Sequence, residues 1–284
     1  MPEGDTIFRT ARTLDRALAG WPVTRFETVL PHLARVEVDL TVTGRAVENV
    51  EARGKWVLVH LSGDLVLLTH MLMSGSWHIY RPGETWQRAR THMRIVLGTE
   101  RIWAVAFNVQ VAEFHSAASL KRRAGLNALG PSLLTPSDDG AAVARLRASP
   151  DLEIATALMK QSLLAGIGNV FKSEICFVAG VHPFRLVRSL ADDQLRALVS
   201  TARKLLQANV ADMSDNSQVT YRGLRSTTGR RNPEERLWVY HRAGQPCRRC
   251  GEAIDSYRQG PDARTTFWCP RCQPAPRLAG RARS

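Results

Sequence analysis

The first residues of the chain, Met1-Pro2-Glu3-Gly4-Asp5, carry groups that can do covalent chemistry. Methionine is commonly removed before a residue as small as proline, which would leave Pro2 with a free secondary amine. Such an amine attacks an aldehyde carbon and forms an iminium ion. The ordinary pKa of a terminal amine, about 7.7 to 8.0, leaves a minority of chains neutral and nucleophilic near neutral pH. Glu3 is a candidate for moving protons, although an early proline by itself is usually only the start of a helix.

Four of the five cysteines form two pairs near the C-terminus: Cys247 with Cys250, and Cys269 with Cys272. Paired thiolates with 18 residues between the pairs suit tetrahedral Zn²⁺. A closed set of four sulfurs predicts one structural zinc and argues against a disulfide framework. The fifth cysteine, Cys176, lies in an apolar helical pattern and is expected to be a buried, unreactive thiol.

Two further motifs lie in the first half of the chain. Lys55 follows Gly54 at the start of a predicted strand, where a ligand can approach the backbone closely; an ordinary solvated lysine is the alternative. The stretch Met71-Leu72-Met73-Ser74-Gly75 is apolar and runs into a glycine turn. Large apolar groups at a loop tip can wedge between base steps of a kinked duplex, although core packing is the commoner explanation.

Two more motifs lie in the second half. Gly166-Ile167-Gly168-Asn169 predicts a tight turn that opens a helix, whose amides and asparagine side chain would bind an anion such as a DNA phosphate. Many such turns merely permit close helix packing. Arg264 lies near the turn of a hairpin predicted between the cysteine pairs, with Ala263–Trp268 as its second strand. An arginine there can grip a phosphate or simply face solvent.

Composition sets the class of partner. With 284 residues the chain is long enough for two main domains and an appendage. Lys and Arg outnumber Asp and Glu by 39 to 26, and the net charge of +13 favours nucleic acid as a partner over an anionic membrane. No apolar stretch is long enough to span a bilayer and no signal-peptide layout is present, so we expect a soluble, cytoplasmic protein. No self-complementary pattern is visible, so we expect a monomer.

The elements that must position these residues follow from periodicity. A first helix is predicted up to Gly20, with Asp5 or Thr6 as its N-cap. Short runs broken by turns at 62–64 and 98–100 predict an antiparallel sandwich or barrel, with strands at 55–61, 65–73, 92–97 and 101–107. Helices are predicted at 138–148, 153–161, 170–179 and 190–208, the last with Ser189 and Asp192 in a capping-box pattern.

Taken together, these motifs resemble the formamidopyrimidine-DNA glycosylase and endonuclease VIII family over essentially the whole chain except the tail. The matching residues are Pro2-Glu3-Gly4, Gly54-Lys55, Gly166-Ile167-Gly168-Asn169, and Arg264 ahead of Cys269-Pro270-Arg271-Cys272. The resemblance implies an α+β multidomain fold. Its expected parts are an N-terminal catalytic β-sandwich (1–118), a linker (119–135), a helix-two-turn-helix DNA-binding domain (136–236) with a mobile loop (211–236), a zinc-finger hairpin (237–274) and a disordered basic tail (275–284).

The resemblance also implies roles for single residues. Pro2 would be the nucleophile and Glu3 the general acid and base, with Lys55 an essential cation of the catalytic pocket. Gly168, Asn169 and Arg264 would hold the phosphates around a flipped nucleotide, with Arg264 counted among the catalytic residues, and Met73 would fill the void left in the duplex. The implied enzyme is a base-excision-repair DNA glycosylase that is also a DNA-(apurinic or apyrimidinic site) lyase working through β- and δ-elimination.

The two branches of the family leave the lesion open. Gly4-Asp5 and the Trp-rich sheet are more similar to the endonuclease VIII side, whereas Met73-Ser74-Gly75 is similar to the methionine loop of the formamidopyrimidine side. The segment 107–114 lacks the Arg and Phe wedge of that second branch. We therefore expect oxidised pyrimidines in duplex, single-stranded or bubble DNA at the bacterial nucleoid. The alternatives are a purine-lesion glycosylase for 8-oxoguanine, and a catalytically inactive zinc-ribbon protein that binds damaged DNA.

Overall fold

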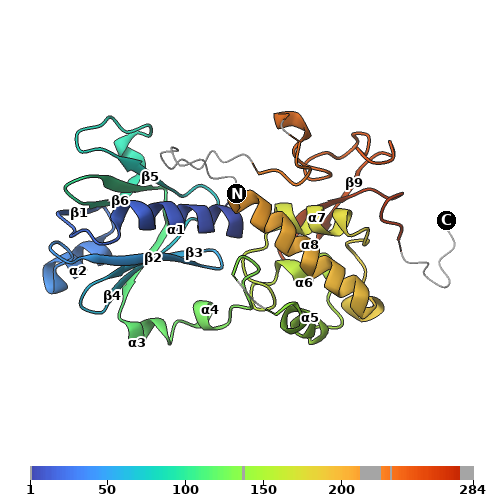
Figure 1. Ribbon diagram of the computed structural model, residues 1–284, viewed down its shortest axis with the longest axis horizontal. Helices are drawn as coiled ribbons and strands as arrows, with labels where there is room; N and C mark the ends of the chain where they lie inside the picture. Colours follow the sequence, from blue (N-terminus) through green and yellow to red (C-terminus); the bar gives the residue numbers. More distant parts are fainter. Residues whose placement is uncertain (1, 136–137, 212–224, 231, 276–284) are drawn as a thin grey trace. The chain divides into compact units, whose positions relative to one another are not determined.

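The computed structural model describes residues 2–135, 138–211, 225–230 and 232–275 (Figure 1). These residues fall into two compact units, which we call the N-terminal unit (mainly 2–128) and the C-terminal unit (mainly 129–209 and 225–275). The division after Ala128 lies within the linker predicted for 119–135. Most of the loop predicted to be mobile (212–224 and 231) and the tail from 276 lie outside the described residues.

The N-terminal unit consists of a first helix and two four-stranded antiparallel sheets. The helix is α1 (Gly4–Leu18). The first sheet has the order β2 (Val47–Arg53), β3 (Trp56–Leu61), β4 (Leu65–His70) and β8 (Val111–His115). The second sheet has the order β1 (Arg25–Thr28), β6 (Met93–Gly98), β7 (Trp103–Phe107) and β5 (Ser76–Tyr80). Short helices connect them: α2 (Pro31–Leu40), η1 (Arg90–His92), α3 (Ala117–Leu120) and α4 (Ala124–Asn127).

Helix α1 packs into the core of this sandwich. Its apolar face is buried with the inner faces of both sheets, including Ile7, Leu14, Val57, Val59, Ile95 and Leu97. The side chain of Asp15 accepts the backbone N–H of Val50 in β2 at 2.7 Å. The N–H of Gly20 donates to the carbonyl of Val47 at 2.8 Å. Because later helix residues meet earlier strand residues, α1 runs antiparallel to β2 (Figure 1).

The predicted sandwich is confirmed, with strand ends shifted by one to three residues. Leu61 pairs with Leu65 and Gly98 with Trp103, on either side of the two predicted turns. The predicted N-cap of the first helix is wrong. The helix begins at Gly4, and its N-cap is Glu3, whose side chain makes no capping hydrogen bond. Asp5 and Thr6 lie inside the first turn and are buried, because that turn packs against the rest of the protein.

The C-terminal unit is helical and ends in a hairpin. Its elements are α5 (Asp139–Arg147), α6 (Ile154–Met159), α7 (Asn169–Val178), η2 (Val187–Ser189), α8 (Asp192–Ala211), η3 (Pro233–Glu235), β9 (Asp255–Gln259) and β10 (Arg264–Trp268). The four helices were predicted, with ends that differ by one to three residues. Their core includes Leu146, Ile154, Phe171, Ile175 and Leu198. Cys176 is fully buried, as predicted, and burial raises the pKa of its thiol to about 12.

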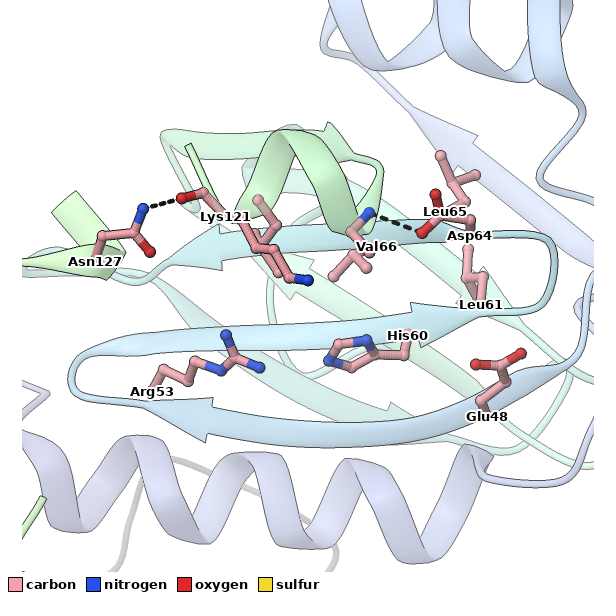
Figure 2. A pocket seen from close by; sticks show the side chains of 11 residues that line it. Glu48, Arg53, His60, Leu61, Asp64, Leu65, Val66, Lys121 and Asn127 are labelled. Carbon is pink, nitrogen blue, oxygen red and sulfur yellow. Dashed lines mark hydrogen bonds between the residues drawn. The ribbon is translucent and has the colours of Figure 1, made fainter. Parts of the chain in front are cut away.

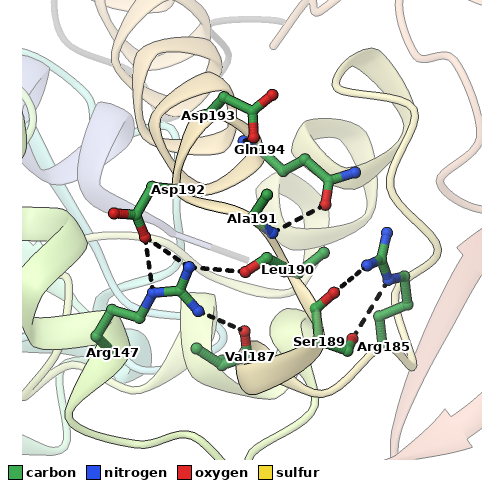
Figure 3. A network of polar contacts seen from close by, with 9 residues as sticks. All are labelled: Arg147, Arg185, Val187, Ser189, Leu190, Ala191, Asp192, Asp193 and Gln194. Atoms are coloured by element: carbon green, nitrogen blue, oxygen red, sulfur yellow. Dashed lines mark hydrogen bonds and ion pairs between the residues drawn. The ribbon is translucent and has the colours of Figure 1, made fainter.

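The capping box predicted for the last helix is wrong (Figure 3). Ser189 belongs to η2, and α8 begins only at Asp192. The backbone N–H of Ala191 donates instead to the side chain of Gln194 at 3.1 Å. Asp192 is bound by Arg147 from α5 at 2.6 Å. This pair joins α5 to the start of α8, a tertiary contact that a local capping pattern does not reveal. Within the described residues, no helix has the length and apolar character needed to cross a bilayer.

Candidate active site and zinc centre

The start of α1 places Pro2 and Glu3 in a buried position. Pro2 is buried, and Glu3 has no exposed surface. The carbonyl of Glu3 accepts the N–H of Ile7 at 3.0 Å, which is the first hydrogen bond of the helix. Ile7 belongs to the sandwich core. Packing of α1 therefore fixes Pro2 and Glu3, the two residues that precede the helix, in place at its start.

The register of α1 against β2 brings Lys55 to the same end of the unit. Glu3 precedes Asp15 by 12 residues, about 18 Å at the helical rise. Lys55 follows Val50 by 5 residues, about 17 Å at the strand rise. The helix and the strand are antiparallel and joined at the contact between Asp15 and Val50. The start of α1 and Lys55 therefore both lie at the end of the sheet where β2 turns into β3.

The methionine loop leaves the sheet at this same edge. Trp56, the residue after Lys55, pairs with His70, the last residue of β4. The loop 71–75 follows directly. Leu72 is 39% exposed and Met73 is 61% exposed, which makes them two of the few large apolar side chains that face solvent in the described residues. The structure thus gathers Pro2, Glu3, Lys55 and Met73 at one edge.

A close backbone approach fixes the shape of this loop. The N–H of Gly75 donates to the carbonyl of Met71 at 2.8 Å. A Cβ atom on Gly75 would lie 2.6 Å from that oxygen, so only glycine fits without a shift of the backbone. Leu72 has a φ of 46°, which is unusual for a residue with a branched side chain. The backbone of the loop is held in a strained conformation, and the side chains of Leu72 and Met73 face solvent.

His70 supports the loop and responds to the cation beside it. Its Nδ1 accepts the N–H of Leu72 at 3.0 Å, and its ring packs edge-on against Trp56 at 4.7 Å. Burial lowers the pKa of His70 below its ordinary value, and the positive charges of Lys55 and Arg123 lower it further. The imidazole is therefore kept neutral and able to accept.

In the C-terminal unit, the glycine turn before α7 is built around one glutamine. The side chain of Gln161 accepts the N–H of Gly166 at 3.0 Å and donates to the carbonyl of Ile167 at 2.9 Å. Gly166 has a φ of 95°, a conformation that favours glycine. Gly168 is the N-cap of α7 and is extended. The turn therefore presents a rigid helix start, the geometry that binds anions.

Asn169, the first residue of α7, is held by a partner that the sequence did not reveal. Its side chain is 8% exposed, and its Nδ2 donates to the hydroxyl of Tyr240 at 3.4 Å. Its Oδ1 has no hydrogen-bond partner among the described residues. The fully buried Glu174 fixes this neighbour by accepting the backbone N–H groups of Trp238, Val239 and Tyr240 at 2.8–2.9 Å. A glutamate inside an apolar helical pattern was the available signal for this role.

Arg264 begins β10, which lies along α7. The N–H of Phe267 donates to the hydroxyl of Ser173 at 3.3 Å. Farther on, the side chain of Gln273 donates to the carbonyl of Val181 at 2.8 Å. Gln273 lies beyond the end of β10 and Val181 beyond the end of α7, so the two contacts follow in the same order along both segments and β10 runs parallel to α7. The start of β10 and the start of α7 therefore lie at the same end, which brings Gly168, Asn169 and Arg264 into one region.

The four cysteines of the C-terminal unit fit a zinc ion. Their sulfurs all lie within 4.8 Å of one another, with Cys247 to Cys272 at 3.9 Å and Cys250 to Cys269 at 3.5 Å. A tetrahedron with Zn–S bonds of about 2.3 Å has edges of about 3.8 Å. Backbone N–H groups of Arg249 and Cys272 point at the sulfurs of Cys247 and Cys269, both at 3.4 Å. One structural zinc in this cluster would hold the base of the hairpin.

A separate pocket of about 280 Å³ lies on the first sheet, where β3 and β4 face α3 and α4 (Figure 2). Its rim mixes cations and carboxylates, including Arg53, Lys121, Glu48 and Asp64. None of the predicted site residues lines it. The mixed charge does not select a ligand class, so we assign it no part in the site.

Comparison with known proteins covers both units, the N-terminal unit with Pro2 and Lys55 and the C-terminal unit with Asn169, Arg264 and the four cysteines. Three family models match in order: the formamidopyrimidine-DNA glycosylase N-terminal domain at residues 1–114, its H2TH domain at 129–220, and the zinc finger found in FPG and IleRS at 244–275. A probable endonuclease 8 2 of Streptomyces coelicolor is 42% identical over 99% of this chain and 98% of its own length. The chain belongs to the formamidopyrimidine-DNA glycosylase and endonuclease VIII family. By this membership it is a DNA glycosylase and DNA-(apurinic or apyrimidinic site) lyase with one structural zinc.

Two further comparisons cover almost the whole chain. The DNA-(apurinic or apyrimidinic site) lyase Nei2 of Mycolicibacterium smegmatis is 39% identical over 97% of this chain and 100% of its own length. The structure of Lactococcus lactis Fpg in complex with DNA containing an abasic site superposes with a TM-score of 0.78 at 22% identity, covering 96% of this chain and 100% of that one. At that identity the likeness concerns the fold, which includes the β-sandwich, the helical H2TH domain and the zinc finger.

Proposed function

We propose that this family member removes oxidised pyrimidines from damaged DNA and then cleaves the strand, with Pro2 as the nucleophile. The observation that carries the proposal is the edge of the N-terminal unit, where α1 and β2 bring Pro2 and Glu3 to the end of the sheet that holds Lys55. An imine-forming amine, a buried carboxylate and a cation are the groups that this chemistry needs. The proposal places the enzyme with DNA in the bacterial cytoplasm, at the nucleoid.

The covalent steps balance with these groups. With the damaged base turned out of the stack, the nitrogen of Pro2 attacks C1′ as the bond from C1′ to the base breaks. The base leaves with a proton that Glu3 supplies. Glu3 then takes up the proton that the Pro2 nitrogen loses and returns it to O4′ as the C1′–O4′ bond breaks, which opens the sugar and leaves an iminium between that nitrogen and C1′. The iminium acidifies the 2′ hydrogens, and removal of one expels the 3′ phosphate. A second elimination expels the 5′ phosphate, and hydrolysis of the iminium then frees Pro2.

The remaining residues would bind the strand around the reacting sugar. Phosphates are held by helix-start amides, by amide side chains and by arginine. Gly168, Asn169 and Arg264 lie together in the C-terminal unit and supply these three kinds of group. Met73 faces solvent and would fill the space that the flipped base leaves. Zinc supports this arrangement by holding the hairpin that carries Arg264.

The choice of lesion rests on the relatives and on one loop. The two bacterial relatives compared above are named a probable endonuclease 8 2 and a DNA-(apurinic or apyrimidinic site) lyase. The loop that follows β7 contains Asn108, with a φ of 54°, and an exposed Gln110, and it has no arginine or phenylalanine at its tip. Without such a wedge, the base opposite a purine lesion has no dedicated partner. This favours oxidised pyrimidines over 8-oxoguanine.

Borohydride trapping on a panel of lesions tests the proposal. We expect a covalent adduct with thymine glycol DNA, located at Pro2 by mass spectrometry of the trapped peptide, and slower reaction with 8-oxoguanine opposite cytosine. Glu3→Gln should abolish base release, whereas Glu48→Gln, which alters an exposed carboxylate of the same unit, should not. An adduct on another residue, or trapping with Met1 retained, contradicts the mechanism. Faster release of 8-oxoguanine overturns the lesion choice, and binding of damaged DNA without any adduct supports the inactive binder.

A further inference from the structure

The second sheet of the N-terminal unit carries a small apolar cluster of its own. It contains Tyr80, Met93, Val96, Val105 and Phe107, separate from the core that α1 shares. Two half-exposed tryptophans pack against it, Trp86 from the loop 81–92 and Trp103 from β7. The ring of Trp86 meets Phe107 at 5.7 Å. The loop therefore covers this face and leaves indole surface at its border.

An arginine lies over the ring of each tryptophan. The guanidinium of Arg25 lies 4.4 Å from the ring centre of Trp103, and that of Arg90 lies 5.5 Å from that of Trp86. The side chain of Arg90 remains 66% exposed, so one face of its guanidinium is open to solvent. Glu27 binds both arginines, at 2.7 and 2.5 Å, and holds them in place. One carboxylate for two guanidinium groups leaves positive charge at this surface.

These side chains border a shallow hollow of about 430 Å³. Trp86, Trp103, Arg88 and Arg90 line it together with Gly83, Ala89 and Glu84. The carboxylate of Glu84 accepts the backbone N–H of Arg81 at 2.8 Å and offsets the charge of one arginine, which leaves the surface positive by the other. Arg88 is half-buried, and within the described part of the chain it has neither a hydrogen bond nor an ion pair. Packing against Phe107 accounts for the position of Trp86. It does not account for Arg88, which lines the hollow without a hydrogen bond or ion pair among the described residues and acts only through its positive charge on the hydroxyl of Tyr80.

We propose that this hollow, formed by the loop 81–92 and β7, is a binding surface for single-stranded nucleic acid. Unpaired bases stack on indole rings and on guanidinium planes, and arginines bind the backbone phosphates between them. Paired bases in a duplex do not offer their faces in this way. The surface would hold an unpaired stretch near a lesion, and it does not depend on the chemistry proposed for Pro2.

Fluorescence anisotropy with a labelled oligothymidylate of about twelve nucleotides tests this, within the site sizes that such surfaces cover. A saturating unlabelled blunt duplex occupies other DNA-binding surfaces. We expect Arg88→Glu to weaken binding about tenfold, as for the loss of one charge-assisted contact. Arg81→Glu is the matched control, since it reverses an exposed charge of the same loop outside the hollow. Excision of a lesion from a blunt duplex should be unchanged in both variants.

Photocrosslinking identifies the surface directly. An oligonucleotide that carries 5-iododeoxyuridine should crosslink to peptides containing Trp86 or Trp103, and Arg88→Glu should reduce the yield. Equal losses in the two arginine variants, or crosslinks only elsewhere, would overturn the inference. Displacement of the oligonucleotide by polyglutamate at the same concentration of charge would show an acidic-peptide site instead. Lesion excision tests the proposed function, whereas oligonucleotide binding and crosslinking test this surface. A failure of one proposal is therefore distinguishable from a failure of the other.

Discussion

Single side chains at the catalytic edge show how burial and charge select a protonation state. His70 accepts a backbone hydrogen bond from Leu72 and therefore supports the methionine loop only while Nδ1 is unprotonated. Burial, Lys55 and Arg123 all disfavour the imidazolium, in that order of effect. Lys55, which we propose to face a phosphate leaving group, thus also helps burial and Arg123 to keep His70 neutral.

The lowered pKa of His70 predicts a defined pH dependence. As the pH falls below about 6.5, the unfolded chain takes up this proton before the folded one does. The contribution of His70 to stability is therefore complete above that pH and declines below it. We expect His70→Gln, which keeps an acceptor for Leu72 but does not titrate, to flatten the fall of the unfolding midpoint between about pH 7 and pH 5.

Thermal unfolding followed across that pH range measures this effect. His92→Gln is the control, because it changes an exposed histidine of the same unit. His182, whose pKa is also lowered, lies in the C-terminal unit and is retained in both variants. Parallel curves for the wild type and His70→Gln would show that the imidazole does not support the loop.

The secondary-structure elements were predictable where local and tertiary signals agree. Short runs rich in Val, Leu, Thr and Trp between turn signals identified the strands, and most residues of β3, β4, β6 and β7 are buried. Capping patterns failed at α1 and α8, where buried first-turn residues and the pair of Arg147 with Asp192 override them. The role of Glu174 was missed because its partners lie more than sixty residues away in sequence. The sequence cannot show such distant hydrogen bonds.

The methionine loop allows a test of the wedge. Met73 is exposed on a loop that Gly75 fixes, which is unusual for an apolar side chain without a partner surface. We expect Met73→Ala to slow excision from a fully paired duplex about tenfold, because extrusion of a paired base costs a few kcal/mol. Excision from a bubble, where the base is already unpaired, should change little.

Single-turnover rates on paired and bubble substrates separate the two effects. Val38→Ala is the matched control, since it shortens another exposed apolar side chain of the N-terminal unit. A Met73→Ala variant that loses the same factor on both substrates would argue for a contact with the lesion itself. No loss on either substrate would leave the exposed methionine without a role in extrusion.

Across the whole molecule, the sequence order of the motifs predicted the family but not the local geometry. The net charge of +13 indicated nucleic acid, and four motifs in order indicated the fold. The order of the motifs says nothing about which side chains are buried. That Glu3 is fully buried, and that Asn169 donates to Tyr240, depends on packing between segments distant in the chain. The place of Arg88 beside two tryptophans likewise becomes visible only once the loop 81–92 is folded.

Zinc links the folding of the C-terminal unit to the proposed contact between Arg264 and a DNA phosphate. The cluster closes the hairpin whose second strand begins at Arg264, and α7 contacts this hairpin through Ser173 and Phe267. Structural zinc supplies folding free energy directly. Removal of zinc should therefore release the hairpin from α7 and withdraw Arg264 from the phosphate site, while the sandwich of the N-terminal unit stays folded.

A double-mutant cycle tests this connection. We expect one zinc per chain by elemental analysis, and we expect Cys250→Ser and Arg264→Ala each to weaken binding of lesion DNA about tenfold or more. If zinc acts through Arg264, the two losses are not additive, because the second change removes a contact that is already lost. Fully additive losses would mean that zinc stabilises some other DNA contact. An unchanged affinity in Cys250→Ser would show that the hairpin keeps its place on α7 without the metal, since Phe267 and Ser173 would then suffice to hold it.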